Sequence, residues 1–190
     1  MENISRDIIE QAQAGDRAAF ERIYKAASGF VYNVALRITN NHQEAEEVAQ
    51  DVFLKIYHHL KDFAFRSSFK TWAYRITVNT ALNAYKKTAR GLRGRQDFDT
   101  VIETQPAPDN TQQQVIQQEE RLLNQARLEA LLNKLNVAQR TCIVLREIQG
   151  LSYQEISRVL KINLNTVRSR LKRAREALMA HSAGGQLNGL

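Results

Sequence analysis

The two prolines of this 190-residue chain, Pro106 and Pro108, stand in one short stretch, and no other segment contains a proline. Proline in a helix interior costs about 3 kcal/mol, so its confinement leaves long segments that can be helical on either side. In those segments apolar residues recur every three or four positions, and strand-like alternation is almost absent. The sequence therefore predicts an all-α protein.

The stretch around the prolines also predicts how the chain divides. Residues 91–118 are rich in Gln, Asp, Asn and Thr and poor in large apolar residues, which is typical of a flexible linker. We expect a helical bundle over residues 1–90, a smaller one over 119–180, and a disordered tail over 181–190.

Four helices are predicted in the first bundle, with a loop before the last. They cover about residues 4–14, 16–39, 43–60 and 68–89, and residues 61–69 form the loop. The second and third helices carry long apolar stripes: Phe20 and Tyr24 belong to that of the second, and Tyr57 belongs to that of the third, which we expect to form core.

The third of these helices has an acidic side in a chain that is otherwise basic. That side carries Glu44, Glu46, Glu47 and Asp51, and Leu54 lies off the apolar stripe beside polar residues. An isolated exposed leucine needs no explanation. On a rigid helix it can equally mark a protein-docking patch, and the spacing leaves both interpretations open.

Aromatic and basic residues follow each other between the loop and the end of the fourth helix. Six of the chain's aromatic residues lie between Phe63 and Tyr85, and a basic run without acids begins at Lys86. This combination suits single-stranded nucleic acid, whose unstacked bases need π-faces and whose backbone needs cations. Phe69 and Trp72 are better explained as core residues.

The segment Leu151–Leu178 predicts a helix-turn-helix. Ser152 is placed to cap a first short helix, and Asn163 a second whose apolar stripe begins at Val167. The outer face of the second helix carries Arg168, Arg170, Lys172, Arg173 and Arg175. A solvated charged helix would mix signs, whereas residues 161–176 hold six basic residues and one acid. We therefore expect this helix to enter the major groove of DNA.

Composition excludes several other classes. The net charge of +7 favours a polyanionic partner, and the single cysteine, Cys142, excludes an intramolecular disulfide and fits a reducing compartment. No metal-ligand spacing, catalytic constellation, signal peptide or membrane-spanning run is present, so we expect no metal, no cofactor, no enzymatic activity and no membrane insertion, and a cytoplasmic protein.

Three segments together resemble the extracytoplasmic-function (ECF) class of bacterial sigma factors. They are EAEEVAQDVFLKIYHHLKDF (44–63), FKTWAYRITVNTALNAYKK (69–87) and LREIQGLSYQEISRVLKINLNTVRSRLKRAREAL (145–178). The resemblance covers nearly the whole chain outside linker and tail. It implies a promoter-melting domain (region 2) and a −35-binding domain (region 4). The implied partners are core RNA polymerase (β′ clamp helices and β flap), promoter DNA, and an anti-sigma factor that is often membrane-anchored.

The resemblance also implies roles for individual residues. Docking on the β′ clamp helices would fall to Glu46, Glu47, Gln50, Asp51, Leu54 and Lys55. A flipped base of the −10 element would be held by the loop Ala64, Phe65, Arg66, Ser67 and Ser68 with Asn79 beneath it, and Arg75, Lys86 and Lys87 would lie near the DNA backbone. The −35 element would be read by Arg168, Ser169, Lys172 and Arg173.

Two positions depart from the family pattern, and two rival classes remain. Lys161 stands where a small residue is common in the turn, and Asn165 where glycine is common; lysine at positive φ would cost about 1 kcal/mol. The first rival is an operator-binding regulator whose N-terminal bundle senses a ligand or dimerises, and the second is a nucleic-acid enzyme. The base chosen by the −10 loop cannot be transferred from the family.

Overall fold

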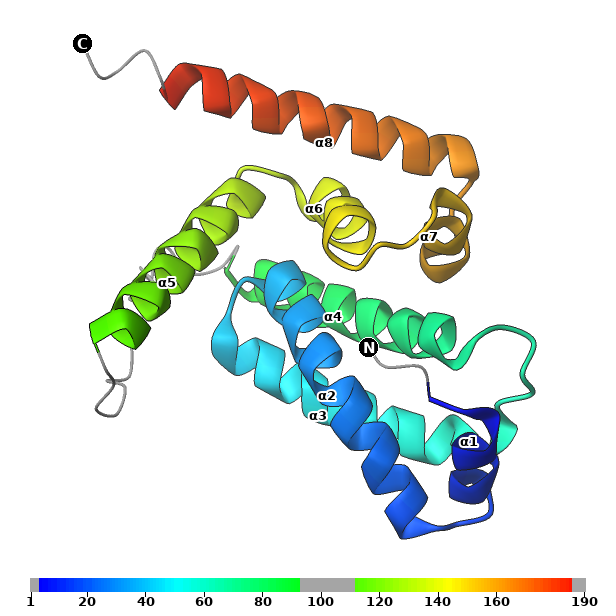
Figure 1. Cartoon of the computed structure of the whole chain (residues 1–190). Coiled ribbons are helices and arrows are strands. Elements are labelled where there is room, and N and C mark those ends of the chain that lie inside the picture. Colours follow the sequence, from blue (N-terminus) through cyan, green and yellow to red (C-terminus); the bar gives the residue numbers. More distant parts are fainter. Residues whose placement is uncertain (1–3, 93–111, 186–190) are drawn as a thin grey trace.

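This computed structural model describes residues 4–92 and 112–185, with side chains for residues 4–90 and 123–180. Its regular structure in those ranges is helical, which confirms the all-α prediction (Figure 1). The elements are α1 (Arg6–Gln13), α2 (Arg17–Thr39), α3 (His42–His59), η1 (Leu60–Asp62), α4 (Phe69–Leu92), α5 (Gln112–Asn133), α6 (Val137–Ile143), η2 (Val144–Ile148), α7 (Tyr153–Leu160) and α8 (Leu164–Gly185).

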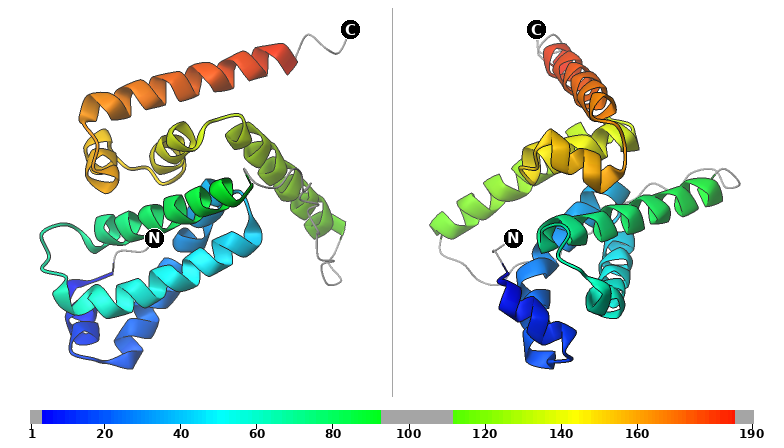
Figure 2. Two further views of the ribbon diagram at one scale, coloured as in Figure 1. Left: turned by 180° about the vertical axis from the view of Figure 1, so that it is seen from behind. Right: turned by 90° about the vertical axis from the view of Figure 1, so that its right-hand side faces the viewer.

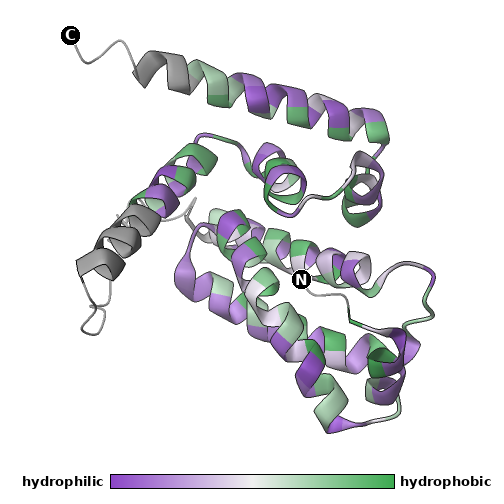
Figure 3. Cartoon of the chain, in the orientation of Figure 1, coloured by the Kyte–Doolittle hydropathy of each residue, from purple (hydrophilic) through white to green (hydrophobic). Residues whose placement is uncertain are grey.

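In the N-terminal bundle, α1 to α4, polar residues mark where α2 and α3 begin and where α2 ends. The Asp16 carboxylate accepts hydrogen bonds from two backbone N–H groups at the start of α2. Asn40 ends α2 in the left-handed conformation, and the Asn41 side chain caps α3 by accepting from Glu44 N at 2.9 Å. The break predicted between the second and third helices is therefore confirmed. Helices α2, α3 and α4 pack together, and Figure 3 shows that they present both apolar and polar faces.

The C-terminal bundle, α5 to α8, is also built on capped helices. Asn136 and Gln139 form a capping box at the start of α6. A π-helical turn, η2, follows α6 directly, whereas the apolar pattern of the sequence predicts one regular helix over residues 137–147. That prediction was wrong in its second half, because apolar periodicity does not separate an α-helix from a short π-helical turn.

The two bundles lie against each other. Helix α7 packs on α4 and α6 on α2, and the views in Figure 2 show α6 and α7 between α8 and the N-terminal bundle. The Tyr74 hydroxyl of α4 donates to Gln149 Oε1 at 2.7 Å, and the Arg140 guanidinium of α6 lies 5.6 Å from the ring centre of Tyr85. The buried apolar residues of both bundles form one continuous cluster, from Ile9 to Ala174. The structure is therefore a closed arrangement of the two bundles.

The structure corrects the predicted bounds of the linker and of the C-terminal tail. Helix α8 continues to Gly185, so the predicted disorder from His181 was wrong for the first five tail residues. Helix α5 begins at Gln112, within the predicted linker, because the glutamines there are good helix formers. The rest of the predicted linker (93–111) and tail (186–190) lies outside the described residues. Within the described ranges, no helix is both long and apolar enough to cross a membrane.

Candidate functional surfaces

The predicted docking residues of α3 form two neighbouring rows along the helix. Glu46, Gln50 and Leu54, spaced by four, line a groove toward α2. Glu47, Asp51 and Lys55, with the same spacing, line a hollow toward α4. Residues four apart lie above one another on a helix, so each row is continuous. The predicted patch is thus brought together, but it faces two different hollows.

The groove between α2 and α3 (the docking groove) has apolar walls and an accessible volume of about 630 Å³. Its exposed apolar side chains are Leu54 at 58 %, Tyr57 at 57 % and Tyr24 at 48 % exposure. The Phe20 and Tyr57 rings meet edge to face, with their centres 5.1 Å apart. These aromatic residues are packed by neighbours but still present a face to solvent.

The assignment of Tyr57 to the core was wrong, and Tyr24, on the apolar stripe of α2, is also about half exposed. Both fall on the helical period of the buried stripe, but at its margin. Tyrosine is suited to a margin because its ring packs while its hydroxyl stays hydrated. That amphipathic chemistry is the signal that could have identified them.

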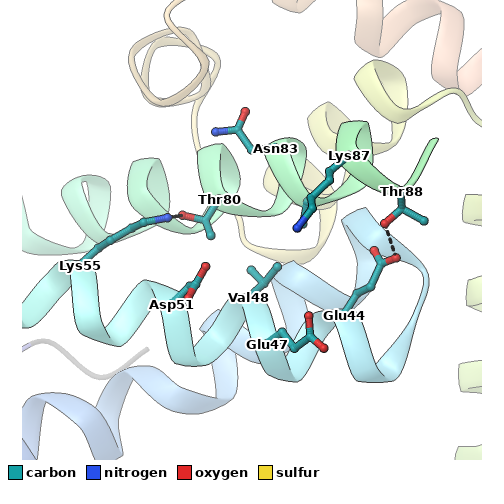
Figure 4. A pocket seen from close by; sticks show the side chains of 10 residues that line it. Glu44, Glu47, Val48, Asp51, Lys55, Thr80, Asn83, Lys87 and Thr88 are labelled. Carbon is teal, nitrogen blue, oxygen red and sulfur yellow. Dashed lines mark hydrogen bonds between the residues drawn. The ribbon is translucent and has the colours of Figure 1, made fainter. Parts of the chain in front are cut away.

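The hollow between α3 and α4 is mixed in charge and smaller, at about 470 Å³ (Figure 4). Lys55 Nζ donates to Thr80 Oγ1 at 3.1 Å, and the Thr88 hydroxyl donates to Glu44 Oε1 at 2.7 Å, so side chains bridge the helices at both ends. Asn83 and Lys87 complete the α4 side. Thr80 and Asn83 were missed by sequence reasoning, although both share a face with Lys87 by their helical spacing.

The loop before α4 is anchored more firmly than its sequence indicates. Gln13 of α1 donates from Nε2 to the Leu60 and Phe63 carbonyls, at 2.9 Å each. Phe65 adopts the left-handed conformation with φ of 54°, and its half-buried ring lies 4.5 Å from the Arg6 guanidinium carbon. The Ser68 hydroxyl accepts from Thr71 N at 3.1 Å and so caps α4. Of the five predicted loop residues, Ala64, Arg66 and Ser67 are exposed. They have neither the left-handed conformation of Phe65 nor the capping role of Ser68.

Most of the aromatic residues in this region belong to the core. Phe69 and Trp72 are buried, as predicted, and Phe63 and Tyr74 are buried as well. The expectation of exposed aromatic faces was therefore wrong for Phe63 and Tyr74, because the first packs on Phe69 and Trp72 and the second meets Gln149 of the other bundle. Burial raises the pKa of Tyr74 to about 12.

The predicted polar and basic residues of α4 are all exposed: Arg75, Asn79, Lys86 and Lys87. Arg75 and Asn79 are four residues apart and share a face. Arg75 lines a cavity with Arg66 and Ser67 of the loop, while Lys87 faces the α3 hollow. The structure thus brings the loop and Arg75 together but places Lys87 at another hollow.

The helix-turn-helix forms as predicted. Ser152 and Glu155 make a capping box at α7, and the Ser152 backbone N–H donates to Glu155 Oε2 at 2.7 Å. Hydrogen bonds from the Ser152 backbone and hydroxyl lower the pKa of Glu155. Lys161 ends α7 with φ of 52°, which is the left-handed conformation expected at this turn, and Asn163 Oδ1 accepts from Asn165 N at 2.8 Å at the start of α8.

The predicted reading residues lie exposed on α8: Arg168, Ser169, Lys172 and Arg173. Arg175 differs, because it pairs with Glu147 of η2 at 2.7 Å and donates to the Tyr153 hydroxyl. Arg170 is half-buried near Cys142. Burial raises the pKa of the Cys142 thiol, and the Arg170 guanidinium offsets only part of this rise. The outer face predicted from charge alone therefore included two residues that tie α8 to its own bundle.

Comparison with known families identifies the two bundles. Residues 23–91 match the family "Sigma-70 region 2" and residues 125–178 match "Sigma-70, region 4". Together these matches cover most of the chain and define a sigma factor of the sigma-70 type, a family of transcription initiation factors.

Similar proteins narrow the class. The RNA polymerase sigma-H factor of Pseudomonas aeruginosa is 34 % identical over 177 residues, covering 91 % of both chains. The ECF RNA polymerase sigma factor SigW of Bacillus subtilis is 31 % identical, covering 94 % of this chain and 96 % of its own. The ECF RNA polymerase sigma-E factor of Escherichia coli K12 is 33 % identical, covering 90 % of each. The chain therefore belongs to the ECF class of sigma factors.

Two solved structures share this fold. CnrH, solved in complex with the cytosolic domain of CnrY, superposes with a TM-score of 0.70 at 25 % identity, covering 96 % of this chain and 99 % of its own. The sigma factor RpoE of Bartonella quintana, solved with the anti-sigma factor NepR, has a TM-score of 0.67, covering 85 % and 94 %. At 23 % identity the second likeness supports the fold alone.

Proposed function

We propose that this ECF sigma factor binds core RNA polymerase through the docking groove, reads the −35 element with α8, and captures an opened −10 strand with the loop before α4. The observation that carries the proposal is that one chain exposes an apolar groove bordered by acids and, elsewhere, a capped basic helix. An operator-binding regulator explains only the second of these surfaces.

The docking proposal rests on the chemistry of the groove. Protein interfaces favour Tyr and exposed aliphatic anchors surrounded by polar residues, and Leu54, Tyr57 and Tyr24 provide such anchors beside Glu46 and Gln50. The β′ clamp helices are the partner that the family implies, with the β flap as a second contact for region 4. Lys55, with Glu47 and Asp51, lines the hollow toward α4 and would extend this docking surface along α3.

The −10 proposal assigns the loop and α4 to single-stranded DNA. Ala64, Arg66 and Ser67 are exposed and would meet a base that has left the stack, and Arg75 and Asn79, which share a face of α4, would add polar contacts. Lys86 and Lys87 would contact the backbone. Binding an unstacked base offsets part of the cost of opening the duplex, which is how this surface would promote melting.

The −35 proposal assigns Arg168, Ser169, Lys172 and Arg173 to the major groove. A single helix-turn-helix reads few base pairs, at about 1–3 kcal/mol each, so its tether to a second DNA-contacting domain on the polymerase raises its effective concentration. The polymerase supplies the chemistry of RNA synthesis.

Run-off transcription with sigma-free core polymerase tests the whole proposal. We expect promoter-specific transcript from this chain and core alone; no transcript at any candidate promoter would refute it. Arg173→Ala should weaken −35-dependent initiation by about 1–3 kcal/mol. Arg175→Ala removes the same charge from the same helix but touches Glu147, so it is the matched control and should retain −35 dependence.

The solved relatives also suggest a regulator. CnrH and RpoE were each solved with a partner, and NepR is an anti-sigma factor. We propose that a cognate anti-sigma factor, anchored in the membrane, holds this chain, which otherwise acts with the polymerase in the cytoplasm. Affinity capture of the tagged chain should then recover a membrane protein that blocks run-off transcription; a capture partner without that effect would contradict the idea.

A further inference from the structure

A cavity of about 890 Å³ lies between the two bundles in the closed structure. One wall is the loop before α4 with the first turns of that helix, and the opposite wall is α7 with the turn after it. The lining side chains that matter here are Arg66 and Arg75 on the first wall and Arg158 and Lys161 on the second.

The cavity is positively charged and its charges are not neutralised within the described residues. Four cations line it against one acid, Asp62, and none of the four makes an ion pair there. Glu155 interacts with Arg158 at longer range, but its carboxylate accepts hydrogen bonds from Ser152. Each positive charge therefore raises the free energy of the others when the bundles close.

Hydroxyl side chains and strained backbone occur at the same place. Ser67, Thr71 and Ser157 also line the cavity, where the Ser67 and Ser157 hydroxyls donate to the Ser68 and Ile162 carbonyls and the Thr71 hydroxyl pairs with that of Ser68. Two of the three non-glycine residues with positive φ in the described chain, Phe65 and Lys161, lie at its opposite walls, the first beside lining residues and the second among them. Strained backbone of this kind clusters at ligand sites because the surrounding structure must maintain it.

We propose that this interdomain cavity binds a condensed phosphate chain, free or as the triphosphate of a nucleotide, and that the bound anion holds the two bundles closed. Guanidinium groups bind phosphate oxygens in bidentate fashion, and Lys161 adds a point charge from the other wall. The volume is that of a small-molecule site. A volume of about 890 Å³ suits such a small anion and not a length of DNA duplex.

The anion would compete with the proposed function, because Arg66 and Arg75 serve both. Only this consequence rests on the proposed function; the binding itself can be measured without DNA or polymerase. Isothermal titration of the full chain with sodium tripolyphosphate at 0.15 M salt should give saturable binding at one site per chain. Absence of saturable binding would overturn the proposal.

Matched double variants separate this site from general attraction to a basic protein. Arg158→Gln with Lys161→Gln should weaken binding by at least about tenfold, or about 1.4 kcal/mol. Lys172→Gln with Arg173→Gln removes the same charge from α8 and should leave the affinity within about twofold. Equal losses in the two variants, or sodium sulfate binding as tightly as tripolyphosphate, would overturn the site.

Two further arms identify the source of the phosphate and separate the two proposals. If a nucleoside triphosphate binds with the same affinity as tripolyphosphate, the phosphate chain alone is recognised. If it binds more tightly, the cavity walls also contact the nucleoside. If neither compound binds, the site is refuted. Arg158 and Lys161 are not assigned to promoter DNA, so their double variant should still support run-off transcription and should resist inhibition by tripolyphosphate. Inhibition equal to that of the wild type would refute the competition.

Discussion

Replacing Leu54 with alanine should weaken binding to core RNA polymerase while the protein remains folded. The Leu54 side chain is 58 % exposed in the docking groove, so a partner that covers the groove would bury that fraction anew. Full burial of a leucine is worth about 1.5–3 kcal/mol, and 58 % of this is about 0.9–1.7 kcal/mol. The expected loss is therefore about 4-fold to 16-fold in Kd.

The buried remainder of Leu54 sets the cost to folding. It corresponds to about 0.6–1.3 kcal/mol, which is small beside the 5–15 kcal/mol of a typical domain. Circular dichroism should therefore show a native helical spectrum at 25 °C and a melting temperature lowered by only a few degrees. Leu54→Glu should bind more weakly still, because the interface would also have to desolvate a carboxylate.

Fluorescence anisotropy of the labelled chain titrated with core polymerase measures the loss. Met179→Ala is the control, because Met179 of α8 is 64 % exposed but lies outside the docking groove. Binding by Leu54→Ala within twofold of the wild type would refute the assignment of the groove. So would a loss of the same size from Met179→Ala.

Two other substitutions give three expected outcomes. Ser152→Ala should cost about 1 kcal/mol of unfolding free energy in chemical denaturation, since it removes the cap of α7. Because the folded-state pKa of Glu155 is lowered, the stability that its carboxylate contributes is present above the unfolded pKa and is lost as pH falls through the folded pKa. In Ser152→Ala this loss of stability at acid pH should be smaller. An unchanged dependence of stability on pH would contradict the cause given. Lys161→Gly should raise the unfolding free energy by about 0.5–1 kcal/mol, because glycine tolerates φ of 52°, and a lower melting temperature would argue against strain at this turn.

The helices and their ends could be predicted because local chemistry determines them. The Asn40–Asn41 break, the Ser152 cap and the left-handed Lys161 turn each depend on residues within one or two helical turns. Periodicity also separated the buried stripe of α3 from Leu54. These features need no information from distant parts of the chain.

The missed features depend on neighbours far away in the sequence. Tyr74 packs on Phe30, 44 positions earlier, and donates to Gln149, 75 positions later; Arg175 is paired with Glu147, 28 positions earlier. A pattern on one helix cannot show which partner covers it. The exposure of Tyr24 and Tyr57 was missed for a related reason, since the packing of α2 against α3 decides how much of each ring is covered.

The closed arrangement places different demands on the two proposed interfaces. The docking groove is open while the bundles are closed, since Leu54 and Tyr57 remain more than half exposed. The loop and Arg75, by contrast, face α7 across the interdomain cavity. If these surfaces act as proposed, polymerase can bind the closed form, whereas capture of a −10 strand requires α7 to leave. When only a fraction of the molecules has a site open, the apparent affinity for its ligand is reduced in proportion to that fraction. Every contact that stabilises the closed form therefore weakens DNA binding and leaves polymerase docking unaffected. Docking first and opening second is then the order that the geometry favours.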